Sequence, residues 1–311
     1  MRFHATRRPS AWPPYHENRQ MLNQPQFRPP AEADSLILQV DQGCPYNGCT
    51  FCGMYKQVRY QRRSLAEIRK MIEVEARGAP YVNRVFLADG DVMRRSFADL
   101  EAILRELAAH FPDLARVNVY ATGSGIMAKT ADELRALRAL KLHTLYLGLE
   151  SGDEDILRRV KKGETAELMV GAGRMAQAAG LKISVMILLG LGGVERTRQH
   201  AFETAMALNR LQPRLLSALR VVPVPGTGLH DEMLAGSFKP LTELQVVQEL
   251  RLLVQHLELT NTVFRANHTS NPIPLEARFG RDKVRLMAEL DALITSGALD
   301  NRTPGRTPLW L

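Results

Sequence analysis

Short apolar runs recur along the chain and alternate with longer amphipathic stretches. The runs are rich in Val, Leu and Ile and cover residues 35–41, 83–89, 116–122, 143–150, 182–190 and 216–224. Strands that are covered on both faces, as in a parallel sheet, have this nearly continuous apolar character. The pattern therefore predicts six parallel β-strands.

The stretches between the runs carry signals for helices. Ser64 and Glu67, and later Thr130 and Glu133, have the spacing of a capping box. Apolar residues at positions 97–111 recur with the helical period of about 3.6 residues. Six strand–helix units joined by right-handed crossovers are fewer than the units of a closed barrel. We therefore expect an α/β fold, a partial (β/α)6 TIM-type barrel.

The two ends of the chain differ from this alternating region. Residues 1–33 are rich in Pro, Arg, Gln and Asn without a clear period, so we expect an irregular N-terminal arm before a barrel domain at 34–230. The pattern then changes. Helices are expected at residues 241–258 and 273–296, with an extended segment between them at 260–268. This mainly helical C-terminal extension, 231–311, is expected to cap the substrate side of the barrel.

Composition narrows the class of protein. The chain has 311 residues, of which 45% are hydrophobic and 24% are charged, as in ordinary globular proteins. Its net charge of +8 permits contact with anionic ligands or nucleic acid without requiring it. The N-terminus lacks the apolar core of a signal peptide, and the longest apolar run, 183–191, is too short to span a membrane. We therefore expect a cytoplasmic protein with no membrane contact.

All three cysteines of the chain lie together, just after the first predicted strand. Cys44, Cys49 and Cys52 follow the pattern C-x4-C-x2-C. The loops that follow the strands of a parallel α/β sheet form its active face, so these thiols lie where chemistry is expected. Three cysteines in a chain of this length do not form a disulfide framework, and their clustering suits a reducing compartment.

Three interpretations of these thiols are open. They could be buried free cysteines, although chance clustering of every cysteine in one loop is improbable. A structural zinc site would need a fourth ligand, and the nearest downstream histidine, His110, lies on a predicted helix. A [4Fe–4S] cluster held by three thiolates would leave one iron open for a small molecule, which accounts for the missing ligand.

The cysteine motif resembles the hallmark of the radical S-adenosylmethionine (SAM) enzymes. In that family three cysteines follow the first strand of a partial (β/α)6 barrel, as C-x3-C-x2-C with an aromatic residue before the last cysteine. Phe51 fills the aromatic position, and the first spacing is one residue longer than the usual form. The resemblance implies that Cys44, Cys49 and Cys52 bind a [4Fe–4S] cluster whose open iron binds SAM.

The end of the second strand extends the resemblance. The segment LADGD at 87–91 stands where the family has a Gly-Gly-Glu-like motif. The resemblance implies that Asp89, Gly90 and Asp91 bind the amino group of SAM through backbone carbonyls and a carboxylate. Without that context, the same segment would be an ordinary Asp-Gly turn.

The end of the fourth strand carries the more specific match. The segment GLESGDEDILRRVKKG at 148–163 is similar to a block of the branch that includes coproporphyrinogen oxidase-like and Elongator-like proteins. The resemblance implies that Glu150, assisted by Ser151, holds the ribose hydroxyls of SAM. It also implies that Arg159 and Lys162 pair with the SAM carboxylate. The alternative is a capped helix with a charged face.

Two further segments resemble the adenine-binding parts of the family. ILLGLGGVE at 187–195 is similar to the glycine motif of strand five, which implies that backbone at Gly190 approaches adenine, although Glu195 is displaced by one residue. RVVPVPGTG at 220–228 resembles the strand-six segment, which places Val222 near adenine.

Candidates that could face the substrate are Tyr55 and Tyr120.

The resemblance implies a radical SAM enzyme. Reductive cleavage of SAM would give a 5′-deoxyadenosyl radical that abstracts hydrogen from an unidentified substrate, most simply a small molecule, with flavodoxin or ferredoxin as electron donor. Two alternatives stay open. The protein could be a non-catalytic relative that binds a cluster or a tetrapyrrole, or an RNA-modifying radical SAM enzyme that uses its basic surface.

Overall fold

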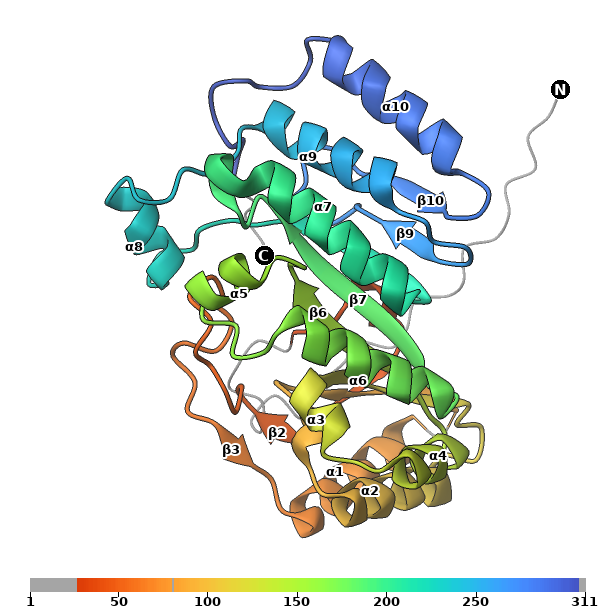
Figure 1. The fold of residues 1–311 in the computed structure, drawn as a ribbon. Helices are drawn as coiled ribbons and strands as arrows, with labels where there is room; N and C mark the ends of the chain where they lie inside the picture. Colours follow the sequence, from red (N-terminus) through yellow and green to blue (C-terminus); the bar gives the residue numbers. More distant parts are fainter. Residues whose placement is uncertain (1–26, 80, 308–311) are drawn as a thin grey trace, which may run out of the picture.

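The predicted strands are present and lie side by side as parallel neighbours (Figure 1). The computed structural model describes residues 27–79 and 81–307. The strands of the barrel are β1 Leu36–Gln39, β4 Arg84–Ala88, β5 Arg116–Ala121, β6 Leu142–Glu150, β7 Lys182–Leu189 and β8 Leu215–Arg220. Because each pairs in parallel with the next along the chain, their carboxyl ends meet at one edge of the sheet.

Helices cover the outer face of this sheet. They are α1 Leu65–Gly78, α2 Phe97–His110, α3 Gly123–Met127, α4 Ala131–Ala139, α5 Glu154–Arg159, α6 Ala166–Ala178 and α7 Gly193–Leu211, with a 3-10 helix, η3 Val92–Arg94, before α2. Both predicted capping boxes form, at Ser64 and at Thr130. The main hydrophobic core lies between strands and helices and includes Val85, Leu104 and Leu145.

Aromatic side chains fill the inner face of the barrel. Phe86 lies edge-on to Tyr120 and Tyr146, with ring centroids 4.9 and 5.7 Å apart. The short 3-10 helix η2, Pro30–Glu32, brings Glu32 into the same interior, where the carboxylate accepts hydrogen bonds from Tyr146 and Asn118. The predicted irregular arm therefore ends in an ordered turn, and residues 1–26 of that arm lie outside the described residues.

The C-terminal extension continues the sheet. Strand β9, Val263–Arg265, pairs in parallel with β8, and β10, Glu276–Arg278, pairs antiparallel with β9. The described sheet therefore has eight strands. Helices α9, Glu243–His256, and α10, Lys283–Thr295, lie in the outer layer, with α9 against α7 (Figure 1). The short helix α8 is Gly228–Leu234.

The structure corrects the expectation of one helix over 273–296. The first part of that range forms β10, and α10 begins only at Lys283. The expected helix at 241–258 and extended segment at 260–268 are confirmed as α9 and β9.

One part of the extension lies at the carboxyl end of the barrel strands. The loop between β9 and β10 contacts β8, since Asn271 Nδ2 donates to the carbonyl of Ala218 at 2.8 Å and Ser270 Oγ accepts from the Arg220 amide at 3.2 Å. A capping role for the extension stays a prediction, and this loop is the segment best placed for it.

The segment that carries the cysteines leaves and re-enters the fold through a narrow neck. Strand β2, Asp41–Gln42, pairs antiparallel with β3, Gln61–Arg62, and closes the loop at residues 43–60, which we call the cysteine loop. Arg95 is buried behind this neck, 1% exposed, and donates to Asp41 Oδ1 at 2.5 Å. It also donates to the carbonyls of Val40 and Arg63 at 2.9 and 2.8 Å.

Replacing Arg95 with Met is expected to lower the free energy of unfolding by about 3–5 kcal/mol, because Asp41 would be left buried without its charge partner. Denaturant titration of the purified protein measures this loss. Arg105→Met is the matched control, because Arg105 forms an exposed pair with Glu101 and its loss should cost less than about 1 kcal/mol. If both substitutions lowered the free energy of unfolding equally, the buried pair of Arg95 and Asp41 would not be stabilising the neck.

Candidate active site

The cysteine loop is fastened to the ends of other strand–helix units. The Thr50 amide donates to the carbonyl of Val160 at 2.9 Å, at the end of α5. The Thr50 carbonyl accepts from the Leu229 amide at 2.9 Å, in α8. Tyr46 Oη donates to the carbonyl of Lys161 at 2.8 Å. These bonds hold the three half-buried thiols at the carboxyl end of the barrel.

The longer spacing between the first two cysteines is taken up by a left-handed turn. Asn47 has φ of 46°, a conformation that asparagine tolerates better than most residues. Its amide lies 3.4 Å from Cys44 Sγ, and its side chain donates to the carbonyl of Tyr55 at 2.7 Å. The extra residue therefore makes a turn that is bonded within the loop.

A glycine lets the end of β4 approach the first cysteine. Gly90 has φ of +44°, and a Cβ at this position would lie 2.4 Å from the Gly43 oxygen and 2.9 Å from Cys44 Cα. No other residue fits there without moving the cysteine loop. Gly53 makes a similar approach, since a Cβ there would lie 3.2 Å from Val224 Cγ1 after β8.

In the described residues the three thiols do not form a ready-made single-ion site. Thiolates that share one tetrahedral zinc at about 2.3 Å lie within about 4 Å of one another. Among the described residues, the sulfur atoms of the three cysteines do not all lie within 4.8 Å of one another. Burial raises the pKa of the Cys49 thiol, Lys162 lowers it, and Glu150, Cys52 and Cys44 raise it, to a net value of about 11. The three thiols therefore lie close enough to influence one another electrostatically, and Cys49 is protonated at neutral pH in the protein alone.

Glu150 and Lys162 form an ion pair beside Cys49. Lys162 Nζ lies 3.1 Å from Glu150 Oε1, and the two side chains are 13% and 12% exposed. Burial alone would lower the pKa of Lys162, but Glu150 and Cys49 outweigh this effect and raise it. Glu150 has φ of 61° where the β6–β7 register shifts, and a Cβ on Gly148 would lie 2.2 Å from its Oε1. The strand end is thus shaped to turn this carboxylate toward the thiols.

The acidic residues after β4 have other partners. Asp89 is 1% exposed, and its carboxylate accepts from Gln39 Nε2 at 2.6 Å, from the Gly43 amide at 3.3 Å and from Tyr55 Oη at 3.0 Å. Burial raises the pKa of Asp89. The side chain therefore fastens the cysteine loop to β4.

Asp91 is also committed within the protein. Its carboxylate accepts hydrogen bonds from the hydroxyl and the amide of Thr122, at the end of β5. Burial raises the pKa of Asp91 to about 6, against the lowering effect of the Thr122 hydrogen bonds. A role for either aspartate side chain toward SAM stays a prediction, and the main chain at 88–90 is the part of this turn that packs on the cysteine loop.

Ser151 lies in a buried network behind Glu150. His200 Nε2 lies 3.0 Å from the Leu188 carbonyl, which only accepts, so this nitrogen carries a proton and Nδ1 accepts from Ser151 Oγ at 2.8 Å. Glu249, on α9, accepts from the Gly190 amide at 2.7 Å and lies 3.6 Å from His200. The Ser151 hydroxyl and the Gly190 amide therefore face the protein interior.

Sequence reasoning missed both His200 and Glu249. Glu249 is 2% exposed, and burial raises the pKa of its carboxyl. A signal was present, because Glu249 occupies a position on the buried face of α9 between Val246 and Leu253. An acid on an apolar helix face indicates a buried partner.

The remaining predicted cofactor residues line the β7 and β8 ends. Phe51 packs against the cluster of Leu191, Val221 and Phe238. Arg159 donates to the Leu191 carbonyl at 2.7 Å and lies over the Phe238 ring at 5.3 Å, so it does not join the Glu150 pair. Val222 is half-buried next to this cluster.

The two tyrosines proposed to face the substrate differ in their environment. Tyr55 is 6% exposed and its hydroxyl is bonded to Asp89. Tyr120 lies on the inner face of the barrel against Phe86, and burial, Asp89 and Glu32 raise its pKa. Tyr120 is therefore the better placed of the two to meet a ligand inside the barrel.

The arrangement of three cysteines at the carboxyl end of a parallel partial barrel defines a class of metalloenzyme. A family model for the radical SAM superfamily matches residues 38–205, more than half of the chain. The chain belongs to the radical SAM superfamily, whose members use a [4Fe–4S] cluster and SAM, and it is an enzyme of that class.

Individual relatives are distant. The chain is 24% identical over 206 residues to an uncharacterized methyltransferase of Pyrococcus horikoshii, covering 65% of this chain and 42% of that protein. It is also 24% identical over 172 residues to the 4′-phospho-dehydrooxetanocin synthase of Priestia megaterium, covering 50% and 23%. The chain thus spans less than half the length of these relatives.

Solved structures share the fold. Methylornithine synthase superposes with a TM-score of 0.51 at 17% identity, covering 88% of this chain and 83% of that one. The hydrogenase maturase HydG of Carboxydothermus hydrogenoformans gives a TM-score of 0.50 at 21% identity, covering 72% of this chain and 52% of that one.

In the described residues, no helix combines the length and apolarity needed to cross a bilayer.

The pKa of Asp91 predicts a pH-dependent contribution to stability. Because the folded-state pKa of about 6 exceeds the ordinary aspartate value of 3.8, the folded protein binds the proton more tightly, and this stabilisation is lost as pH rises from about 4 to about 6. The difference in unfolding free energy between the wild type and Asp91→Asn should change by roughly 2–3 kcal/mol over that range. Denaturant titrations of both proteins at each pH test this, and a constant difference would contradict it.

Proposed function

We propose that Cys44, Cys49 and Cys52 bind a [4Fe–4S] cluster whose open iron takes SAM, and that the enzyme uses it to abstract hydrogen from a small-molecule substrate. The observation that carries this proposal is the buried Glu150–Lys162 pair beside Cys49. A carboxylate and an ammonium group next to the thiols match the ribose hydroxyls and the carboxylate of SAM. A single-ion site would have no need of this pair.

When bound, the reduced cluster would supply one electron for cleavage of SAM to methionine and a 5′-deoxyadenosyl radical, which would take hydrogen from the substrate. The protein binds and orients. Glu150 would accept hydrogen bonds from the ribose hydroxyls, and Lys162 would pair with the SAM carboxylate. Main-chain atoms at Gly90 and Val222 would approach the amino group and adenine.

The inner face of the barrel is the proposed substrate site. Phe86, Tyr120 and Tyr146 form an aromatic wall there, with the Glu32 carboxylate bonded to Tyr146 beside it. Apolar walls exclude water from a reactive radical. Tyr120 would contact the substrate, and an electron donor such as flavodoxin or ferredoxin would dock outside the barrel.

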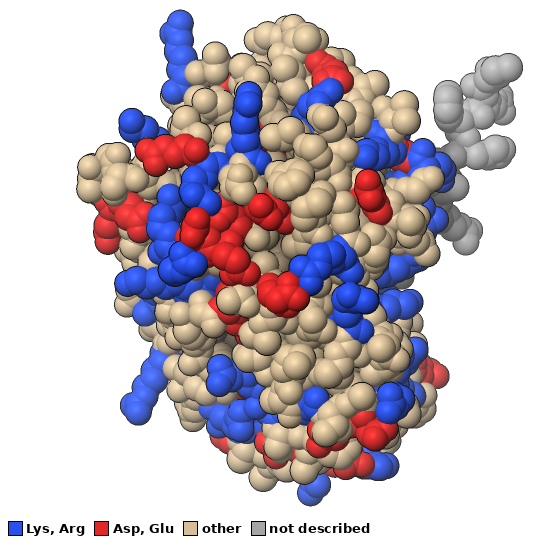
Figure 2. Space-filling model, viewed as in Figure 1, with Lys and Arg blue, Asp and Glu red and all other residues tan. Residues whose placement is uncertain are grey.

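An RNA substrate is the second candidate, and the charges on the face drawn in Figure 2 do not favour it. On the face drawn in Figure 2, Lys and Arg alternate with Asp and Glu among the described residues, without a continuous basic band. A nucleic-acid track normally groups its basic side chains. RNA binding that persists above physiological salt would overturn this preference.

Iron analysis and a SAM-cleavage assay test the proposal. Anaerobically reconstituted protein should contain about four irons per chain, and Cys49→Ala should retain far less. With dithionite and SAM, the loaded protein should release 5′-deoxyadenosine. Stoichiometric zinc in place of iron would overturn the cluster. A loaded cluster without SAM cleavage would instead favour a non-catalytic carrier of a cluster or a tetrapyrrole.

Glu150→Gln is expected to weaken SAM binding by roughly 10- to 100-fold, because a charge-assisted hydrogen bond to the ribose is lost. Titration of SAM in the 5′-deoxyadenosine assay measures this, with iron content as the check that the loop is intact. Glu195→Gln is the matched control, since Glu195 is exposed in the first turn of α7. Unchanged SAM affinity in Glu150→Gln would exclude the ribose contact.

A further inference from the structure

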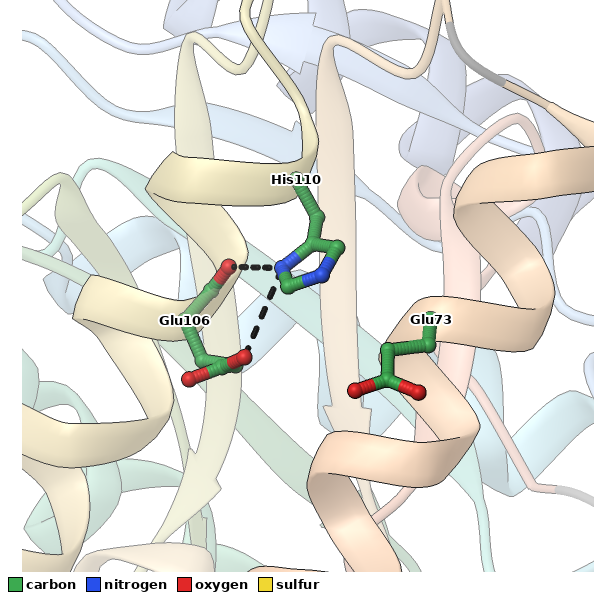
Figure 3. Close-up of side chains that lie close together, drawn as sticks. All are labelled: Glu73, Glu106 and His110. Carbon is green, nitrogen blue, oxygen red and sulfur yellow. Dashed lines mark hydrogen bonds and ion pairs between the residues drawn. The ribbon is translucent and has the colours of Figure 1, made fainter.

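A second group of metal-binding side chains lies on the outer layer of the protein. Glu73 on α1 faces Glu106 and His110 on α2 (Figure 3). One ligand atom from each lies within 4.8 Å of the other two. Within residues 27–79 and 81–307, Glu73, Glu106 and His110 are the group of His, Cys, Asp or Glu side chains whose ligand atoms lie this close together. It belongs to two helices that pack against each other, away from the thiols.

Hydrogen bonding prepares the histidine for a metal. His110 Nδ1 lies 3.0 Å from the main-chain carbonyl of Glu106. A carbonyl only accepts, so in the neutral ring the proton is on Nδ1, which also lies 3.5 Å from Glu106 Oε1, and the lone pair is on Nε2. Histidines that bind metals commonly donate their other ring nitrogen to a backbone carbonyl in this way. Figure 3 shows the ring between the two carboxylates, with Nε2 on the side of Glu73.

The carboxylates are accessible and carry excess negative charge. Glu106 and His110 are 22% and 30% exposed, so an ion could reach them and keep a water ligand. Arg69 Nε lies 3.2 Å from Glu106 Oε2, but the Arg69 side chain is 63% exposed and free to move. One arginine against two carboxylates leaves the group one negative charge in excess. A divalent cation would reverse this imbalance.

The ligand types select the class of ion. Imidazole favours zinc and similar transition metals, whereas calcium and magnesium favour oxygen ligands alone. Three protein ligands leave one position of a tetrahedral zinc for water. We propose that Glu73, Glu106 and His110 form a Zn²⁺-class site that clasps α1 to α2. Because α1 follows β3 directly, the bound ion would stabilise the layer that supports the neck of the cysteine loop.

The test uses cluster-loaded protein, so that the thiols are occupied. Titration with Zn²⁺ in a calorimeter should give one site per chain, and His110→Ala and Glu73→Gln should each weaken it at least tenfold. His256→Ala is the matched control, since His256 lies in the last turn of another outer helix, α9, and should leave the affinity unchanged. Glu73→Gln keeps the shape of the side chain and guards against misfolding of the histidine variant.

A spectroscopic arm separates this site from the cysteine loop. In a variant with all three cysteines replaced by serine, which carries no iron–sulfur absorption, bound Co²⁺ should show weak ligand-field bands. These bands should disappear when His110→Ala is added to that variant. Binding that depends on the cysteines, or that survives both His110→Ala and Glu73→Gln, would overturn the proposal. Neither result depends on SAM cleavage, so this site and the proposed function fail independently.

Discussion

The guanidinium of Arg95 holds the neck of the cysteine loop, and the position of every thiol depends on that neck. The loop between β2 and β3 has little regular structure, so repeated backbone hydrogen bonds do not fix its path. Arg95 bonds both strands of the neck from behind, through Asp41 and the carbonyls of Val40 and Arg63. A planar fork of donors can satisfy several acceptors at once, which the point charge of a lysine does less well.

Burial divides the polar side chains at the strand ends into two groups. A buried carboxylate needs donors, and Asp89, Asp91 and Glu249 take theirs from neighbouring loops and strand ends, which they thereby fasten together. Glu150 and Lys162 have each other and stand next to Cys49. Asp89, Asp91 and Glu249 fix the neighbouring segments in place, and the Glu150–Lys162 ion pair is the part that a ligand could rearrange.

Local patterns in the sequence predicted the barrel strands and most of the helices, and the roles that the motifs assign to the site residues stay predictions. Parallel strands and capping boxes depend on neighbouring residues, so they could be predicted directly. The roles of Arg95, His200 and Glu249 could not, because each has a partner more than 40 residues away in the sequence, Asp41, Ser151 and Gly190 respectively. The missed strand β10 left a weak signal, an alternation of buried Leu275, Ala277 and Phe279 that is short for a strand.

The closed neck also bears on how the enzyme acquires its iron. In small zinc domains the metal supplies the free energy of folding, so chelation unfolds them. Here hydrogen bonds within the chain close the loop at both ends and fasten Thr50 to α5 and α8. The chain's own hydrogen bonds would therefore hold the loop before the proposed cluster binds at the half-buried thiols. If the cluster is inserted after folding, a shortage of iron would leave intact, inactive protein.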